Sequence, residues 1–126
     1  IMGEKKESSA AATLGEEENA ALKKSFSKII EFGDYNTAFM ELDMGTVDVI
    51  AMDIGVAKAQ MSSRDASKYT ILSENLSTEK YGVGFLLGNT ELRDKVEATL
   101  QAMLKDGTFL KIAQKWNLQD SVCLGE

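Results

Sequence analysis

The stretch VDVIAMDIG, residues 47–55, decides the fold of this chain. Its short continuous apolar run, between Asp48 and Asp53, is typical of a strand buried in a parallel sheet. The residues that follow, 54–63, are compatible with a short helix, so the stretch predicts a strand that leads directly into a helix. Asp53 stands at the junction, which leaves two interpretations for it: an N-cap of the helix, or a ligand-binding carboxylate at the edge of the sheet.

The same alternation of strand and helix runs outward from this stretch toward the N-terminus. Strand-like segments at 1–6 and 27–32 are followed by helix-compatible segments at 8–15 and 33–45, and residues 16–26 are also helix-compatible. Two later segments, YTILSE (69–74) and YGVGFLL (81–87), are strand-like as well. Alternating strands and helices predict an α/β fold with a mostly parallel sheet and helices on both faces.

The C-terminal part has the clearest helical periodicity of the chain. A helix is expected here with its N-cap at Asn89 and its stop at Gly107. Its apolar stripe consists of Leu92, Val96, Leu100, Met103 and Leu104. A further helix is expected from Thr108, because apolar residues recur at helical spacing between Phe109 and Trp116. Residues 117–126 are polar and are expected to fray.

The composition excludes several classes of protein. The 126 residues suit one compact domain, and the net charge of −6 argues against nucleic acid as a partner. The chain has no histidine, which removes histidine-based catalytic sites and histidine metal ligands. It has no apolar run long enough to span a membrane, and its single cysteine, Cys123, is expected to be of no consequence.

A second strand-to-helix junction carries Ser8 and Ser9. Serine at a helix N-terminus suits a small anion such as a carboxylate, but serine before alanines is more often a plain N-cap. In open parallel sheets, ligands bind at the carboxyl ends of strands. An anion-binding turn here and the Asp53 carboxylate on another strand end match the two charges of an α-amino acid. Asp43, Asp48 and Asp53 lack the spacing of a calcium loop, so neither a metal nor a cofactor is implied.

The residues of three segments resemble a known family, the solute-binding proteins of bacterial amino-acid ABC transporters (family 3), which have two lobes of the periplasmic-binding-protein type. The segments are SSAAATL (8–14), TAFMELDMGTVDVIAMD (37–53) and EKYGVGFLLGNTELRDKVEATLQAMLKDGTFLKIAQKW (79–116). The resemblance runs from about Gly3 to Trp116. Its most specific part is the last segment, in which a tyrosine-glycine strand, a long helix, an Asp-Gly turn and a terminal Lys-Trp follow in family order.

The resemblance implies a site and a division of the chain. It assigns the α-carboxylate of the ligand to Ser8, Ser9 and Ala10, and the α-ammonium group to Asp53. Residues 1–75 correspond to the second lobe, and residues 76–126 to the crossover strand and C-terminal helices that complete the first lobe. Glu7 departs from the family pattern, which usually has glycine there.

The resemblance also implies a function that involves no enzymatic step and no cofactor. A protein of this kind binds an extracytoplasmic amino acid, in the periplasm or at the cell surface, between its lobes and delivers it to an ABC transporter permease. The chain starts at about the first strand of the second lobe, so we expect an incomplete fragment that binds ligand weakly or not at all. We expect it to cover the apolar stripe from Leu92 to Leu104 by self-association or rearranged packing.

Two other functions share the same fold. A ligand-binding module of a sensor or receptor would have every residue named here and would differ in what is fused to it. An enzyme like the cyclohexadienyl dehydratases would need an acid or base, and the absence of histidine counts against it. A turnover assay with prephenate or arogenate separates the enzyme from the binding protein.

Overall fold

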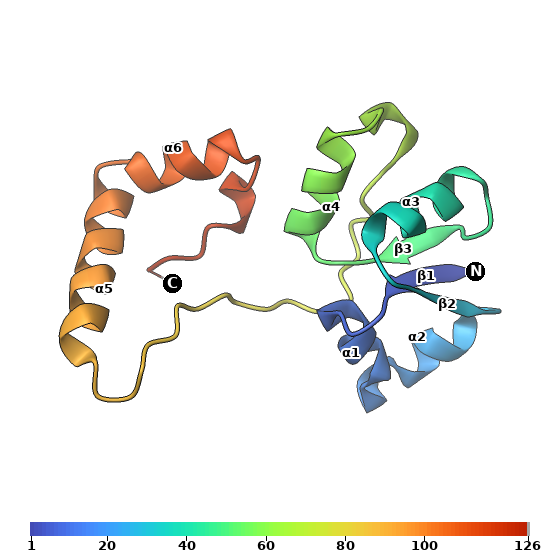
Figure 1. Ribbon diagram of the computed structural model, residues 1–126, viewed down its shortest axis with the longest axis horizontal. Helices are drawn as coiled ribbons and strands as arrows, with labels where there is room; N and C mark the ends of the chain where they lie inside the picture. The colour runs from blue at the N-terminus through green and yellow to red at the C-terminus, as the bar shows by residue number, and fades with distance from the viewer. Residues whose placement is uncertain (126) are drawn as a thin grey trace. The chain divides into compact units, whose positions relative to one another are not determined.

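A computed structural model describes residues 1–125 of the chain. The chain divides into two compact units, Ile1–Thr78 and Glu79–Glu126, named here the N-terminal unit and the C-terminal unit (Figure 1). The expectation of one compact domain, which came from the length alone, is therefore wrong. Within residues 1–125, no helix combines the length and the apolar character that a membrane crossing requires.

The N-terminal unit is built on a parallel sheet of three strands. They are β1 (Met2–Lys5), β2 (Ile29–Phe32) and β3 (Val49–Ala51). The strand order is β2-β1-β3, with Gly3 opposite Ile30 on one side and Ile50 on the other. The predicted α/β fold with a parallel sheet is confirmed, and the stretch around residues 47–55 supplies one edge of the sheet.

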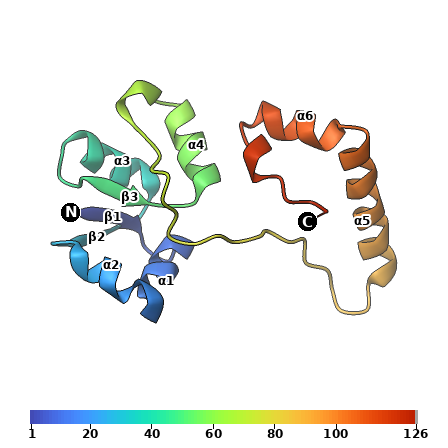
Figure 2. The same ribbon diagram turned by 180° about the vertical axis from the view of Figure 1, so that it is seen from behind.

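Helices lie on both faces of this sheet. They are α1 (Ser9–Gly15), α2 (Ala20–Ser25), α3 (Tyr35–Asp43) and α4 (Ile54–Ser62), with short 3-10 turns at Glu17–Asn19 and Ala66–Lys68. The connection from β1 to β2 and the connection from β2 to β3 run in opposite directions across the sheet. Right-handed crossovers therefore place α1 and α2 on one face and α3 on the other, together with α4 (Figure 2).

The core of the unit depends on small and apolar side chains between the sheet and α1. Met2, Leu14, Ala10 and Ala51 are buried together there. On the opposite face the Phe32 ring lies against Gly3, because a Cβ atom at Gly3 would come within 2.8 Å of the ring. The glycine thus lets an aromatic side chain of β2 cross over β1.

Glu4 is a charged residue in the middle of this sheet. Its side chain is only 6% exposed, and one carboxylate oxygen, Oε2, has no hydrogen-bond partner among the described residues. Burial raises the pKa of Glu4, the neighbouring charge of Glu31 on β2 raises this pKa further, and Lys23 opposes the shift. A buried carboxylate without a full set of partners destabilises the fold.

Replacing Glu4 with glutamine is therefore expected to raise the free energy of unfolding at pH 7 by about 1 kcal/mol. The pKa of Glu4 is raised in the folded chain, so the folded state binds the proton more tightly than the unfolded state does. Protonation of Glu4 therefore stabilises the fold fully below pH 4.5, the ordinary pKa of glutamate, and this stabilisation is lost as the pH rises through the pKa of Glu4 in the folded chain. Urea denaturation across this pH range should show the loss in the wild type and a smaller one in Glu4→Gln. Glu18→Gln, at an exposed position, is the control, and parallel pH curves for wild type and Glu4→Gln would contradict the prediction.

A cluster of polar and aromatic contacts joins the end of α4 to α3. The Arg64 guanidinium lies 4.5 Å from the centroid of the Phe39 ring and donates a hydrogen bond to Asn36 Oδ1 at 2.8 Å. Tyr69 packs edge-on against the same ring and donates to Asp43 Oδ1 at 2.7 Å. These five residues, named here the Arg64 cluster, fasten the chain that follows α4 onto α3.

The C-terminal unit consists of α5 (Thr90–Lys105), α6 (Thr108–Lys115) and a 3-10 turn at Gln119–Ser121. The predicted start at Asn89 and stop at Gly107 are confirmed, and Gly107 has the left-handed φ of 81° that favours glycine. Few apolar side chains are covered: of the described hydrophobic residues in this unit, only Ala113 is buried. Large exposed side chains include those of Leu92, Ile112 and Trp116, which are 48%, 47% and 67% exposed.

Two predicted strands do not form. The segments 69–74 and 81–87 belong to no sheet in the described part of the chain. A strand needs a neighbouring backbone to complete its hydrogen bonds, and an apolar alternation alone cannot supply one. The tail is also more structured than expected, since residues 117–125 include the turn at Gln119–Ser121; residue 126 lies outside the described residues.

Candidate functional site

At the carboxyl edge of the three-stranded sheet, the chain leaves the central strand β1 toward one face and leaves its neighbours β2 and β3 toward the other face. The strand order β2-β1-β3 therefore makes a topological switch point on each side of β1, and the one between β1 and β3 is flanked by Ser8 and Asp53. The chain after β1 enters α1 on one face of the sheet, and the chain after β3 enters α4 on the other (Figure 1). Ligands of open parallel sheets bind in the crevice that such divergent connections create.

Ser8 occupies the β1 side of this position as the N-cap of α1. Its Oγ accepts a hydrogen bond from the backbone N–H of Ala11 at 3.1 Å, and the side chain is half-buried. Ser9 begins the helix with an exposed side chain, and Ala10 is buried. The capping interpretation is therefore confirmed for Ser8, and the carboxylate-binding role of Ser8, Ser9 and Ala10 stays a prediction.

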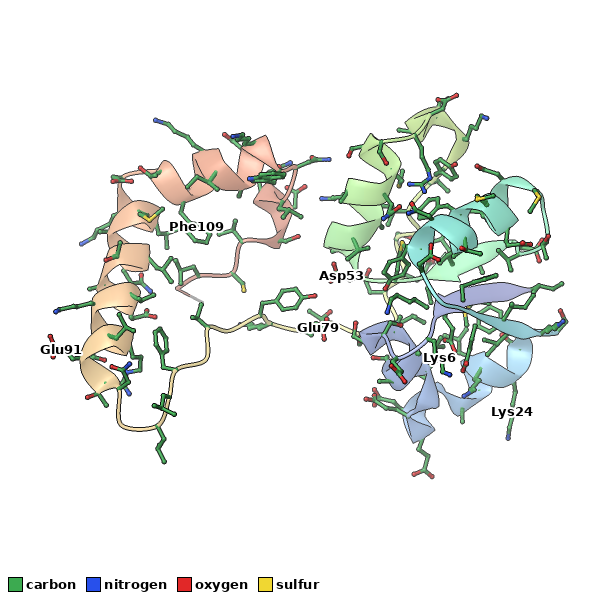
Figure 3. All side chains as sticks on the ribbon, viewed as in Figure 1. Lys6, Lys24, Asp53, Glu79, Glu91 and Phe109 are labelled. Atoms are coloured by element: carbon green, nitrogen blue, oxygen red, sulfur yellow. The ribbon has the colours of Figure 1, made fainter. Side chains whose placement is uncertain are left out.

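Asp53 occupies the β3 side as the N-cap of α4 (Figure 3). Its Oδ1 accepts a hydrogen bond from the backbone N–H of Val56 at 3.0 Å, and the side chain is half-buried. The capping interpretation is confirmed here too, and the ammonium-binding role stays a prediction. Asp48, at the other end of the quoted stretch, has a largely exposed side chain that pairs with the amino group of Ile1.

Tyr35 is a third polar side chain at this position, and the sequence interpretation did not include it. It is the first residue of α3, and its side chain is half-buried. Burial raises the pKa of Tyr35, hydrogen bonding to Ser8 lowers this pKa, and the charge of Asp53 raises it. Ser8, Tyr35 and Asp53 thus each stand where the chain leaves one of the three strands.

The signal that could have identified Tyr35 was available in the sequence. It stands three residues after the last residue of β2, at the same sheet edge as Ser8 and Asp53. A tyrosine at such an edge combines an apolar ring, which can pack, with a hydroxyl that needs a partner. This location deserved the same weight as the other two strand ends.

Glu7 has an unusual backbone conformation just before this cluster. Its φ of 57° is left-handed, a region that favours glycine and costs other residues roughly 1–2 kcal/mol. This explains why glycine suits the position in the pattern that the sequence resembles. The Glu7 side chain is exposed, so the departure places a negative charge on the surface beside Ser8.

Replacing Glu7 with glycine is expected to raise the free energy of unfolding by about 1 kcal/mol, because the left-handed strain disappears. Glu7→Ala is the matched control, since it removes the same charge and keeps the Cβ atom that causes the strain. Urea midpoints for the two variants measure the difference. Equal stabilisation by both variants would show that the charge of Glu7, and not its backbone conformation, is what costs stability.

The three side chains at this sheet edge offer hydrogen-bonding groups of two kinds. They are one carboxylate, which accepts hydrogen bonds, and two hydroxyls, which can donate them. Residues 1–125 contain no group of three or more side chains suited to hold a metal ion. A carboxylate and hydroxyl donors close together recognise a ligand that carries both a positive and a negative group.

The comparison with protein families agrees with this geometry. Residues 17–119 match the sequence profile of the family described as bacterial extracellular solute-binding proteins, family 3. This chain belongs to that family. The matched range includes Tyr35 and Asp53, while Ser8, Ser9 and Ala10 precede it. The resemblance stated from the sequence is confirmed.

Individual relatives of this family-3 chain are transport-related binding proteins. The ABC transporter glutamine-binding protein GlnH of Bacillus subtilis (strain 168) is 26% identical over 103 residues, which are 82% of this chain and 37% of that protein. A putative ABC transporter arginine-binding protein 2 of Escherichia coli (strain K12) is 27% identical over 92 residues, which are 69% of this chain and 37% of that protein. The chain thus spans little more than a third of the length of these relatives.

A solved structure shows the same fold. An ancestral arginine-binding protein bound to glutamine superposes with a TM-score of 0.65 at 32% identity, over 93% of this chain and 49% of that protein. The periplasmic-binding-protein fold of this family-3 chain is thereby established. Ser8, Tyr35 and Asp53 lie at the carboxyl edge of the sheet, which is where open parallel sheets in general bind ligands.

Proposed function

We propose that this chain carries one half of an amino-acid-binding site, as part of a two-lobed solute-binding protein of an ABC transporter. In this proposal residues 1–75 are the second lobe, and residues 76–126 complete the first lobe. The observation that carries the proposal is the position of Ser8 and Asp53 as helix N-caps at the carboxyl ends of the neighbouring strands β1 and β3. Relatives named for binding glutamine and arginine support an amino acid as ligand.

The two charges of the ligand would be recognised separately. Asp53 would accept hydrogen bonds from the α-ammonium group through its carboxylate, whose Oδ1 also caps α4 by accepting from the N–H of Val56. The α-carboxylate would be held by the side chains of Ser8 and Ser9 and by the backbone N–H of Ala10, which lies in the first turn of α1 and has no partner within the helix.

The transport step would follow from closure of two lobes. A ligand that first rests on one lobe gains the contacts to Asp53 and Ser8 only when the second lobe closes, so the closed state binds it more tightly. The closed protein would then deliver the amino acid to a membrane permease on the outer side of the cytoplasmic membrane. Neither a covalent step nor a cofactor is involved.

A titration of this chain with amino acids tests the proposal. Because one lobe supplies only part of the contacts, the dissociation constant for L-glutamine, L-arginine or L-glutamate should lie in the millimolar range or above. Backbone amide NMR shifts at up to about 100 mM ligand measure such weak binding and locate it. Shifts should centre on residues 8–11 and 53–56, and micromolar binding by this chain alone would contradict a site divided between two lobes.

A further inference from the structure

Two methionines stand one helical turn apart at the end of α3. Met40 lies in the last turn of the helix, and Met44 is its C-cap, with right-handed helical backbone angles. The N–H of Met44 donates to the carbonyl oxygen of Met40 at 3.0 Å, so the helical spacing is kept between the two residues. Residues at this spacing share one helix face, with their Cβ atoms roughly 5–6 Å apart.

Both methionine side chains are open to solvent. Met40 is 61% exposed and Met44 is 66% exposed, and neither belongs to the buried core of the N-terminal unit, which includes Met2. A methionine side chain has three rotatable bonds and a polarisable sulfur. Two neighbouring thioethers on one helix face can therefore turn toward the same point above that face.

The charge around this pair favours a cation. The segment 34–53 contains no lysine and no arginine, and its five acidic residues are Asp34, Glu41, Asp43, Asp48 and Asp53. Met40 and Met44 also stand at the C-terminus of α3, where the carbonyl groups of a helix carry a partial negative charge. The cation that packs on α3, Arg64, lies over the ring of Phe39, whose side chain is buried.

The donor atoms decide which cation suits the pair. Thioether sulfur is a soft, uncharged ligand that suits Cu(I), whereas Mg²⁺, Ca²⁺ and Mn²⁺ prefer carboxylate and carbonyl oxygens. The chain has no histidine, and residues 1–125 contain no group of three carboxylate, thiol or imidazole ligands. The described residues thus offer soft thioethers without a competing site for harder ions.

We propose that Met40 and Met44 form a surface site for a soft monovalent metal ion, Cu(I) or Ag(I), which the two sulfur atoms bind together. This site is independent of the proposed amino-acid site, because it lies at the end of α3 opposite to Tyr35 and the carboxyl edge of the sheet. Two uncharged ligands on an open surface bind such an ion reversibly. We expect a dissociation constant of about 10–100 µM.

The experiment is a titration of the 126-residue chain with silver nitrate in a chloride-free buffer. Ag(I) is the probe because it keeps its oxidation state in air. The chain carries Cys123→Ser, since a cysteine thiolate also binds soft metal ions. With methionine methyl groups labelled with ¹³C, the resonances of Met40 and Met44 should shift together and saturate at one ion per chain, while those of the other methionines stay in place.

Variants identify the two ligands. Met40→Leu and Met44→Leu should each raise the dissociation constant at least about tenfold, because one remaining thioether cannot hold the ion between two sulfur atoms. Leucine preserves the size of the side chain and the helix propensity, and circular dichroism verifies that each variant is folded. Met103→Leu, which removes a half-buried thioether from α5, is the matched control and should leave the dissociation constant within twofold.

Several results would overturn the site. They are the absence of a saturable shift of the two resonances at about 1 mM Ag(I), an affinity of both Met40→Leu and Met44→Leu within twofold of the parent chain, and an equal loss of affinity in Met103→Leu. Equal shifts of the two resonances with Mg²⁺ would show that acidic charge alone attracts the ion. No amino acid is present in the titration, so none of these results bears on the proposed function.

Discussion

The variant Asp53→Asn is expected to bind its amino acid at least about thirtyfold more weakly than the wild type, while the free energy of unfolding stays within about 0.5 kcal/mol. Both halves of this expectation follow from the position of Asp53. The carboxylate caps α4 through Oδ1, which accepts the N–H of Val56 at 3.0 Å. Asparagine has a carbonyl oxygen at the same place and is an equally good N-cap, so the helix loses nothing.

The loss in binding comes from charge. An ammonium group held by a carboxylate makes a charge-assisted hydrogen bond, and a neutral amide provides a weaker acceptor together with N–H groups that repel the ligand's own. Isothermal calorimetry or NMR titration measures the affinity, and urea denaturation measures the stability. Affinity unchanged in Asp53→Asn would return this residue to a purely capping role.

The matched control is Asp34→Asn. Asp34 is the N-cap of α3 and follows β2 at the same sheet edge, and its Oδ1 accepts the N–H of Thr37 at 2.9 Å. The substitution removes the same charge from a capping aspartate at an exposed position. We expect it to leave the affinity for the amino acid unchanged. If Asp34→Asn weakened binding as much as Asp53→Asn, a general effect of net charge would explain both.

The second large effect is expected in the oligomeric state. The 126-residue chain should associate with itself at tens of micromolar, because the C-terminal unit leaves most of its apolar side chains uncovered. Side chains of Leu92 in α5 and of Ile112 in α6 are each about half exposed, and covering them stabilises a dimer by roughly 1 kcal/mol each. Leu92→Glu should favour the monomer and raise the dissociation constant of the dimer about tenfold or more.

The control for this effect is Ala98→Glu. It adds the same charge to an exposed position of α5, but on the side of the helix away from the stripe Leu92–Leu104. Sedimentation velocity over a range of concentrations should show association in the wild type and in Ala98→Glu, and less in Leu92→Glu. A wild type that light scattering shows to be monomeric at high concentration would contradict the prediction.

Much of the fold could be predicted because local signals agreed with the final packing. The strands at Met2–Lys5, Ile29–Phe32 and Val49–Ala51 were each followed by a capping residue and a helix. The periodicity of α5 and its stop at Gly107 needed no partner to be recognised. Residues 69–74 and 81–87 have the apolar pattern of strands, but they form none in the described part of the chain. A strand forms only when another backbone segment pairs with it, and the local sequence cannot show whether such a segment is present.

The site was predictable only in part, for a related reason. Ser8 and Asp53 follow strands and cap helices, so their positions could be inferred from local sequence. Tyr35 stands at the same sheet edge as Ser8 because β2 pairs with β1, and strand pairing is a property of the whole sheet. The buried charge of Glu4 was equally hidden, since an acidic residue in a short strand gives no sign of which face it occupies.

The Arg64 cluster has a consequence for how the proposed site would respond to different ligands. Arg64 and Tyr69 fasten the chain that follows α4 onto α3; α3 begins with Tyr35, and α4 begins directly after Asp53. The freedom of α4 to move away from α3 is therefore limited by contacts that lie away from the sheet edge. In the proposed site, such preorganisation would spare the ligand part of the entropic cost of ordering the protein.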